Sequence, residues 1–340
     1  MWSSIRRFAG LAAFTGIALA CLCGSAAAQY NYHYLVSNQS GKAVHTDALL
    51  QNPWGIVYAP GSPFWVSDEA SGWSTLYDGA GNPKSLQVIV PAAGGSGQGT
   101  PTGIVYNGSQ EFAIDNWVSV FLFSTLDGAI CGWSSFDPST ALIGTTRAGA
   151  VYTGLAITSR TSGNLLYAAD SANNRVDVYD GSFSLVNSFT DPASPAGFAP
   201  FGIRDMGGKV YVTFANTTGG TGGFVDIFME DGTFVKQLTH SAAFNQPWGL
   251  AMAPSNFGPL SNTLLVGNNS TAGTISAFNP NTGKFVAKVT DSTGAPIRLT
   301  GLWGLDFGGG TANNGNTNQL FFTSGPNDTD GYFGVIFFHQ

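Results

Sequence analysis

Short stretches of alternating hydrophobic and polar residues recur along the chain, separated by turns rich in glycine, asparagine and aspartate. Residues 154–189 show this plainly, because GLAI, LLYAAD, RVDVYDG and SLVNSF follow one another with a turn signal between each pair. Alternation with a period of two residues indicates a short β-strand with one buried face. This stretch therefore predicts four antiparallel strands.

A glycine in a similar setting begins each unit of this kind. The setting is clearest in QNPWGIVYAP, at residues 51–60, and in NQPWGLAMAP, at residues 245–254. Six such glycines follow at intervals of 48, 51, 48, 47 and 55 residues, namely Gly55, Gly103, Gly154, Gly202, Gly249 and Gly304. Six units of about 50 residues with four strands each are typical of a β-propeller. We expect glycine there because the innermost strands crowd the axis and leave little room for side chains.

The two ends of the chain complement each other. The last unit supplies only three strands, in GLWGLDFG, QLFFTSG and YFGVIFF, while residues 32–38 form a spare strand before the first motif. We expect this spare strand to be the outer strand of the last blade, which would leave the ring without an open edge. The predicted fold is all-β, a six-bladed propeller with four antiparallel strands per blade.

Residues 1–28 differ from the rest of the chain. Arg6 and Arg7 precede an apolar run, and small residues near Ala28 offer a cleavage site. This pattern is typical of a secretory signal peptide; a lipoprotein leader with Cys21 is the alternative. We expect residues 1–28 to be removed on export, and residues 29–340 to form one monomeric propeller domain in the periplasm or outside the cell, without a membrane span.

Composition narrows the choice of partner. Charged residues make up 10% of the chain, against about 25% in a typical soluble domain. Without Arg6 and Arg7, 11 basic residues face 20 acidic ones, so the surface should repel nucleic-acid phosphates. Cys131 is the single cysteine beyond the leader; a buried apolar role is the interpretation we favour over a nucleophile.

Several segments resemble known families. LYAADSANNRVDVYDG, at residues 166–181, resembles the NHL repeat, in which an Asp-Ser-x-Asn turn links two strands. QPWGLA, FLFSTLDGAICGW (residues 121–133) and LFFTSGPNDTDGYFGVI (residues 320–336) resemble an uncharacterised family of exported bacterial conserved hypothetical proteins. The resemblance implies an NHL-like propeller and export, and it brings no established activity. Leu126 stands where we expect an acidic residue in that family.

Polar side chains gather at the turn after the second strand of each unit, which shares a face of the ring with the glycine motif. These residues are Asp68, Glu69, Asp170, Asn216, Asn268, Asn269, Asn327 and Asp328. In the second unit either Asp115 with Asn116 or Asp127 fills this turn, depending on whether EFAID is an inserted strand. Four aromatic residues precede motif glycines at the same rim, namely Trp54, Phe201, Trp248 and Trp303.

These rim residues have two interpretations. Carboxylates and amides around a channel mouth suit a hard cation, and related six-bladed lactonases and lyases hold a central metal. Calcium is therefore the candidate cofactor, with Asp68, Asp170, Asn268 and Asp328 as candidate ligands. The same residue types also serve as ordinary turn residues. The tryptophans either pack between blades or form a rim that binds sugars or other ligands with an apolar face.

Other chemistry has little support. There is no pair at metal-ligand spacing among the histidines His33, His45, His240 and His339. His45 and His240 both precede a Trp-Gly motif, so a zinc site at which they converge is an alternative. Neither a Gly-x-Ser-x-Gly elbow nor a His-Glu-x-x-His motif occurs. The sequence thus predicts a secreted propeller that binds a small molecule, a glycan or a protein. The alternative is a calcium- or zinc-dependent hydrolase or lyase with its site at the channel mouth.

Overall fold

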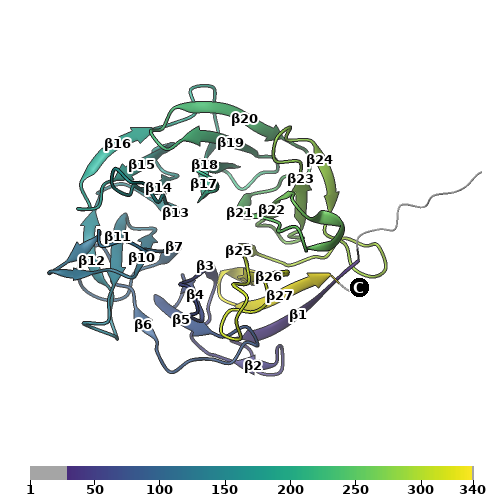
Figure 1. The fold of residues 1–340 in the computed structure, drawn as a ribbon, viewed down its shortest axis with the longest axis horizontal. Helices are drawn as coiled ribbons and strands as arrows, with labels where there is room; N and C mark the ends of the chain where they lie inside the picture. The colour runs from purple at the N-terminus through teal and green to yellow at the C-terminus, as the bar shows by residue number, and fades with distance from the viewer. Residues whose placement is uncertain (1–28, 339–340) are drawn as a thin grey trace, which may run out of the picture.

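The computed structural model describes residues 29–338, which are built almost entirely of β-strands. Five four-stranded sheets and one five-stranded sheet surround a central axis as the blades of a propeller (Figure 1). The six-bladed propeller predicted from the glycine motifs is therefore confirmed. The predicted signal peptide, residues 1–28, lies outside the described residues, so export stays a prediction.

In the first three blades the chain starts beside the axis and moves outward strand by strand. Blade 1 contains β3 (Pro53–Tyr58), β4 (Phe64–Asp68), β5 (Trp73–Tyr77) and β6 (Val88–Ile89). Blade 2 contains β7 (Pro101–Tyr106), β10 (Phe121–Thr125), β11 (Ala129–Trp133) and β12 (Leu142–Thr146). Blade 3 contains β13 (Tyr152–Ile157), β14 (Leu166–Asp170), β15 (Arg175–Tyr179) and β16 (Leu185–Phe189).

The next two blades repeat this order, and the sixth departs from it. Blade 4 contains β17 (Phe198–Asp205), β18 (Lys209–Asn216), β19 (Phe224–Met229) and β20 (Phe234–His240). Blade 5 contains β21 (Pro247–Met252), β22 (Leu264–Asn268), β23 (Ile275–Phe278) and β24 (Phe285–Lys288). Blade 6 draws only β25 (Leu302–Phe307), β26 (Gln319–Ser324) and β27 (Tyr332–Phe338) from the C-terminal part of the chain.

The N-terminal strand completes blade 6. β1 (Tyr30–Ser37) pairs antiparallel with β27, from Tyr30 opposite Phe338 to Ser37 opposite Tyr332, and the short β2 (His45–Thr46) follows beside it. The predicted ring closure is confirmed, with the strand starting two residues earlier than the sequence suggested. Figure 1 shows the purple start of the chain beside its yellow end.

A small hairpin is inserted into blade 2. β8 (Ala113–Ile114) and β9 (Trp117–Val118) pair only with each other and stand apart from the four-stranded sheet. The segment EFAID therefore belongs to an insertion. Asp127, rather than Asp115, follows the second strand of this blade.

The motif glycines bring neighbouring innermost strands close together. A Cβ atom on Gly55 would lie 2.6 Å from the Thr102 carbonyl oxygen, and one on Gly304 would lie 2.6 Å from that of Trp54. None of the six motif glycines has a positive φ, so glycine is required by this close approach rather than by backbone conformation. As expected from the sequence, the centre of the ring has no room for a side chain at these positions.

Hydrophobic side chains fill the spaces between adjacent blades. Between blades 1 and 2, for example, the rings of Trp65 and Phe121 stack with their centroids 4.1 Å apart, and Cys131 is buried beside them. Burial raises the pKa of the Cys131 thiol far above its ordinary value, so it packs as an apolar residue. In residues 29–338 no helix is long and apolar enough to cross a membrane.

Candidate functional site: the central channel

A cavity of about 390 Å³ lies at the centre of the ring and is lined by the innermost strands of all six blades. Its wall is mainly aliphatic, because the residue after each motif glycine lines it. These residues are Ile56, Ile104, Leu155, Ile203, Leu250 and Leu305. A cavity of this size with few polar groups is typical of a small-molecule site.

Aromatic side chains close the channel at the end where the glycine motifs lie. Trp54, Trp248 and Trp303 are 4–9% exposed and form one cluster with the partly buried Phe201 and Leu126. The rings of Trp54 and Trp303 stack at 3.6 Å, and Trp54 also meets Phe201, which lies on the opposite blade, at 6.1 Å. Because blades 1 and 4 face each other across the axis, this aromatic plug crosses the channel.

Hydrogen bonds fix two of the three indole rings in the aromatic plug. The Nε1 atom of Trp248 donates to the Thr153 carbonyl oxygen at 2.8 Å, and that of Trp303 donates to Oδ1 of Asn52 at 3.0 Å. The Nε1 atom of Trp54 is buried and has no hydrogen-bond partner within residues 29–338. The plug is thus held by ring contacts and by two polar anchors.

The channel opens on the opposite face of the ring. Along β3 the side chains change from buried at Pro53 to half-buried at Tyr58, and β7 ends in the same way at Tyr106. Both tyrosines line the cavity. A ligand would therefore approach past these tyrosines and stop at the aromatic plug.

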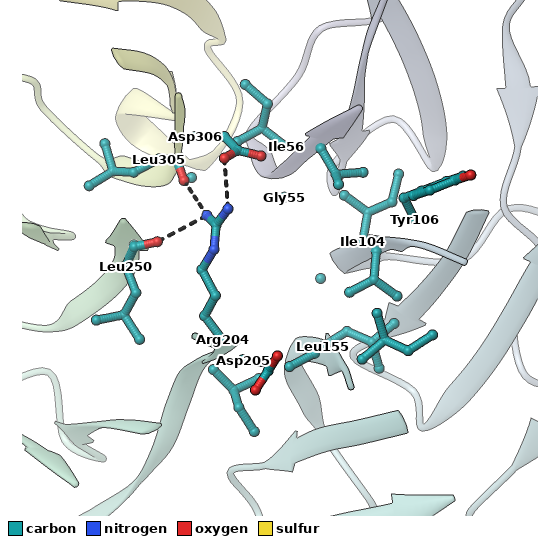
Figure 2. A pocket seen from close by; sticks show the side chains of 18 of the residues that line it. Gly55, Ile56, Ile104, Tyr106, Leu155, Arg204, Asp205, Leu250, Leu305 and Asp306 are labelled. Carbon is teal, nitrogen blue, oxygen red and sulfur yellow. Dashed lines mark hydrogen bonds and ion pairs between the residues drawn. The ribbon is translucent and has the colours of Figure 1, made fainter. Parts of the chain in front are cut away.

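One arginine dominates the polar part of the channel. Arg204, on β17, donates through one terminal nitrogen to the carbonyl oxygens of Leu250 and Leu305, at 3.0 and 2.8 Å. Its other terminal nitrogen pairs with Oδ1 of Asp306 at 2.7 Å. Figure 2 shows this side chain reaching from blade 4 past blade 5 to blade 6. Innermost strands are sheet edges with carbonyl groups facing the channel, and a guanidinium group with several fixed donors suits them.

A second carboxylate lies next to this ion pair in sequence. Asp205 extends from β17 into the cavity (Figure 2). Burial first, and then the nearby Glu230, raises the pKa of Asp205 to about 6. Its carboxylate is one of the few polar groups that line the cavity, so it can accept a hydrogen bond from a ligand.

Three of the four candidate metal ligands are buried, and each bonds to groups of its own blade. Oδ2 of Asp68 accepts hydrogen bonds from the amide and hydroxyl of Thr75, at 3.1 and 2.8 Å. Asp170 accepts from the Val151 amide at 3.1 Å and pairs with Arg175 at 3.3 Å. Asn268 accepts from the Asn245 amide at 2.9 Å. Burial raises the pKa of Asp68 well above its ordinary value.

The remaining rim candidates lie in separate turns and loops. Asn216 bonds to Thr218 in its own turn, and Asp127 accepts from the Ala93 amide at 2.7 Å. Glu69 accepts from the Asn52 side chain at 2.8 Å, while burial and then Asp328 raise its pKa. Asp115 lies in the turn of the inserted hairpin β8–β9, beyond the end of β7, and so does not belong to the motif rim. Asn269 follows β22, and Asn327 and Asp328 belong to a short 3-10 helix, Pro326–Asp328, before β27. Among residues 29–338, no group of three His, Cys, Asp or Glu side chains is arranged to hold a metal ion.

The residues that make the channel polar were missed by the sequence analysis. Arg204 and Asp306 lie two positions after a motif glycine, where the other blades carry Val57, Val105, Ala156 and Ala251. An alignment of the six glycine motifs could therefore have identified both residues, because each is a charged residue inside an innermost strand. Asp205 lies three positions after its motif glycine, where the other five blades carry tyrosine, isoleucine, methionine or phenylalanine.

Known proteins of similar fold include enzymes of several kinds. No protein-family model matches the sequence. A gluconolactonase from Xanthomonas campestris has a TM-score of 0.56 at 13% identity, covering 86% of this chain and 88% of its own. A streptogramin B lyase has a TM-score of 0.54 at 13% identity, covering 91% and 98%. At such identities the likeness concerns the fold alone.

Two relatives in sequence are viral proteins. Uncharacterized protein R648 of Acanthamoeba polyphaga mimivirus is 31% identical over 332 residues, which covers 90% of this chain and 80% of the viral one. Uncharacterized protein L690 of the same virus is 29% identical and covers 92% and 86%. These relatives give no support to the bacterial origin that the resemblance implied. The chain belongs to the same protein family as the mimivirus protein R648.

Proposed function

We propose that this protein binds a small uncharged molecule in its central channel, with the apolar body of the ligand against the aliphatic wall. The proposal rests on the contrast between the aliphatic wall and the few charged groups inside one cavity of about 390 Å³. Six aliphatic side chains line it, an aromatic plug closes it, and the charged groups come from two blades only.

The charges in the channel favour an uncharged ligand over an anion. Arg204 brings one positive charge, and Asp205 and Asp306 bring two carboxylates. The guanidinium of Arg204 is already paired with Asp306 and with two carbonyl oxygens. An added carboxylate would meet Asp205 without a free counterion, and like charges at short range disfavour binding. A hydroxyl group that donates to Asp205 fits, as does a carbonyl group that accepts from an unused Arg204 N–H.

Isothermal titration calorimetry tests the proposal with three probes of similar length. 1-Hexanol and γ-octanolactone supply an apolar body with a hydroxyl or a carbonyl group, and hexanoate supplies the anion. We expect the two uncharged probes to bind with one site per chain and hexanoate to bind at least tenfold more weakly. Binding of hexanoate alone, or of no probe, would contradict the proposal.

A variant in the channel connects the binding to this cavity. Leu155→Trp places a large side chain in the aliphatic wall and should abolish binding of γ-octanolactone. Leu185→Trp is a matched control, because Leu185 is 42% exposed on an outer strand. Equal affinity in both variants would place the binding elsewhere.

The alternative proposal is a metal-dependent hydrolase or lyase at the motif face. The structural similarity to a gluconolactonase and a lyase motivates it at the level of fold. Melting of the protein in EDTA, and then with added calcium or zinc, tests it. A cation at about 100 times its Kd contributes roughly 2.7 kcal/mol, so a shift of several degrees would support this alternative and its absence would count against it.

A further inference from the structure

The backbone of the innermost strands offers hydrogen-bond acceptors at one level of the central channel. In blades 2, 4 and 6 the amide of the motif glycine points outward, because it donates to a hydroxyl group on the second strand of its own blade, at 3.2, 2.8 and 2.8 Å. Backbone groups of successive strand residues face opposite edges, so the next residue directs its carbonyl group toward the axis. These six carbonyl groups, which we call the carbonyl ring, belong to Ile56, Ile104, Leu155, Ile203, Leu250 and Leu305.

Arg204 shows that the carbonyl ring faces the cavity. One of its terminal nitrogens donates to the carbonyl oxygens of both Leu250 and Leu305, at 3.0 and 2.8 Å. The side chain reaches these oxygens from inside the channel (Figure 2). Leu250 and Leu305 belong to the neighbouring blades 5 and 6, so a single N–H₂ group can bridge two adjacent members of the ring. The repeat orients the carbonyl groups of the other four blades in the same way.

The other four members of the carbonyl ring lack a donor of this kind. The carbonyl groups of Ile56, Ile104, Leu155 and Ile203 accept no hydrogen bond from a side chain within residues 29–338. Blades 2 and 3 lie across the axis from blades 5 and 6, and Figure 2 shows open space between the Arg204 side chain and Ile104 and Leu155. A ligand in the cavity therefore meets the carbonyl oxygens of Ile104 and Leu155.

The side chains of the channel add more acceptors than free donors. Asp205 and Asp306 bring carboxylate oxygens, while the terminal nitrogens of Arg204 are already bonded to the carbonyl ring and to Asp306. A ligand that brings acceptors alone would displace water from the free carbonyl oxygens without replacing its hydrogen bonds, and this costs affinity. The channel is therefore complementary to a ligand that donates hydrogen bonds.

We propose that the channel selects uncharged ligands with a primary N–H₂ group, as in a carboxamide or a urea, and that this group bridges the carbonyl oxygens of Ile104 and Leu155. The inference rests on the proposed function, the binding of a small uncharged molecule in this channel, and names its chemical class. The ligand would repeat on blades 2 and 3 what Arg204 does on blades 5 and 6. A hydroxyl group has one hydrogen and reaches one oxygen, and a ketone or ester has none to donate.

Isothermal titration calorimetry of the full chain with hexanamide and 2-heptanone tests this selection. The two molecules have the same length and the same carbonyl group, and a methyl group in the ketone replaces the N–H₂ group of the amide. We expect hexanamide to bind at least about tenfold more tightly, because the ketone leaves two desolvated carbonyl oxygens without a donor. Equal affinities, or tighter binding of 2-heptanone, would overturn the inference and leave the proposed function standing. Binding of neither molecule would contradict both.

A second guanidinium group locates the bridged oxygens. Val57 lines the cavity two positions after the motif glycine of blade 1, as Arg204 does in blade 4. Arg204 reaches the two blades that follow its own, so Val57→Arg should occupy the carbonyl oxygens of blades 2 and 3. We expect the preference for hexanamide over 2-heptanone to disappear in this variant. Val57→Met, with a side chain of similar length and no donor, is the matched control and should keep the preference.

A double variant keeps the test valid if the added charge alone prevents folding. Ala156 lies two positions after the motif glycine of blade 3, as Asp306 does in blade 6. Val57→Arg with Ala156→Asp therefore recreates the pair of Arg204 and Asp306 on the other side of the channel, and it should also lose the preference for hexanamide. Thermal melting shows which variants fold. A preference retained in a folded arginine variant, or lost in Val57→Met, would overturn the assignment to Ile104 and Leu155.

Discussion

The two ends of the channel are built from the same six strands and differ in almost every other respect. At the motif end, Trp54, Trp248 and Trp303 come from equivalent positions of three blades and pack into one buried cluster. At the open end, Arg204 and Asp306 occupy a position that is aliphatic in the other four blades. The repeated residues thus hold the ring together, whereas the residues that break the repeat give the cavity its chemical character.

Removing one tryptophan from the aromatic plug should have the largest effect on stability. Trp303→Ala deletes a ring that is 4% exposed, stacks on Trp54 and bonds to Asn52. We expect the free energy of unfolding to fall by about 3–5 kcal/mol, as for other buried aromatic residues changed to alanine. Urea denaturation measures this loss. Trp117→Ala, at an exposed position in the inserted hairpin, is the control and should cost well under 1 kcal/mol.

At the open end, Arg204→Met should have the next largest effect. The change leaves Asp306, which is 8% exposed, without its cation, and two carbonyl groups without a donor. We expect a loss of about 2–3 kcal/mol, because charge-assisted hydrogen bonds are lost and a buried charge remains. Urea denaturation measures the free energy of unfolding of the Arg204→Met variant and of the double variant Arg204→Met, Asp306→Leu.

The double variant sharpens the contrast between structure and binding. Replacing both charged partners by apolar residues often restores stability, so the double variant should regain most of the lost free energy. γ-Octanolactone should still bind less tightly than to the unmodified protein. If the double variant regained full affinity, the channel charges would serve the fold alone.

A methyl group at a motif glycine tests how tightly the closed end is packed. Gly304→Ala places a Cβ atom 2.6 Å from the Trp54 carbonyl oxygen, so the strands must separate. We expect a cost of about 1–3 kcal/mol, as for other overpacked sites. Gly94→Ala, where no atom lies within 4 Å of the added Cβ, should change the melting temperature little. Similar costs at both positions would argue against close packing of the innermost strands.

The smallest expected effect concerns pH at the open end. The pKa of Asp205 is raised to about 6 from an ordinary value of 3.8, so the folded protein holds this proton more tightly than the unfolded chain. Its contribution to the free energy of unfolding therefore decreases as pH rises from about 4 to about 6. Asp205→Asn removes this dependence and should be about 1 kcal/mol more stable than the unmodified protein above pH 6, after allowance for solvent access. Urea denaturation at pH 4, 5, 6 and 7 gives the comparison.

Most of the fold could be predicted because a repeat multiplies weak local signals. A single Gly motif followed by short alternating strands is ambiguous, but six copies at nearly constant spacing define the blades, and the count of strands in the last unit predicts the closure by β1. The inserted hairpin β8–β9 left the second blade ambiguous, since its alternation looks like that of a blade strand.

The channel residues were harder to predict, for a physical reason. The search for polar groups favoured turns, where aspartate and asparagine are common because they bond to nearby backbone. Asp68 and Asp170 do make such bonds, to the backbone amides of Thr75 and Asn173. Arg204 and Asp306 lie inside strands whose other residues are typical of the core. They belong to blades 4 and 6, and they form a pair only because the long Arg204 side chain reaches past blade 5. The sequence shows which blades carry a charged residue inside the innermost strand, but it does not show which of these residues contact each other.

The way in which β1 closes the ring has a mechanical consequence. Tyr30 at the start of β1 lies opposite Phe338 at the end of β27, so a force that separates these two ends loads the backbone hydrogen bonds one after another. A strand pair loaded in this geometry unzips, losing one hydrogen bond after another, and resists much less force than a pair that is sheared along its length. The seam between β1 and β27 should therefore be the place where pulling on the chain ends first opens the molecule, although Tyr30 at its start is fully buried.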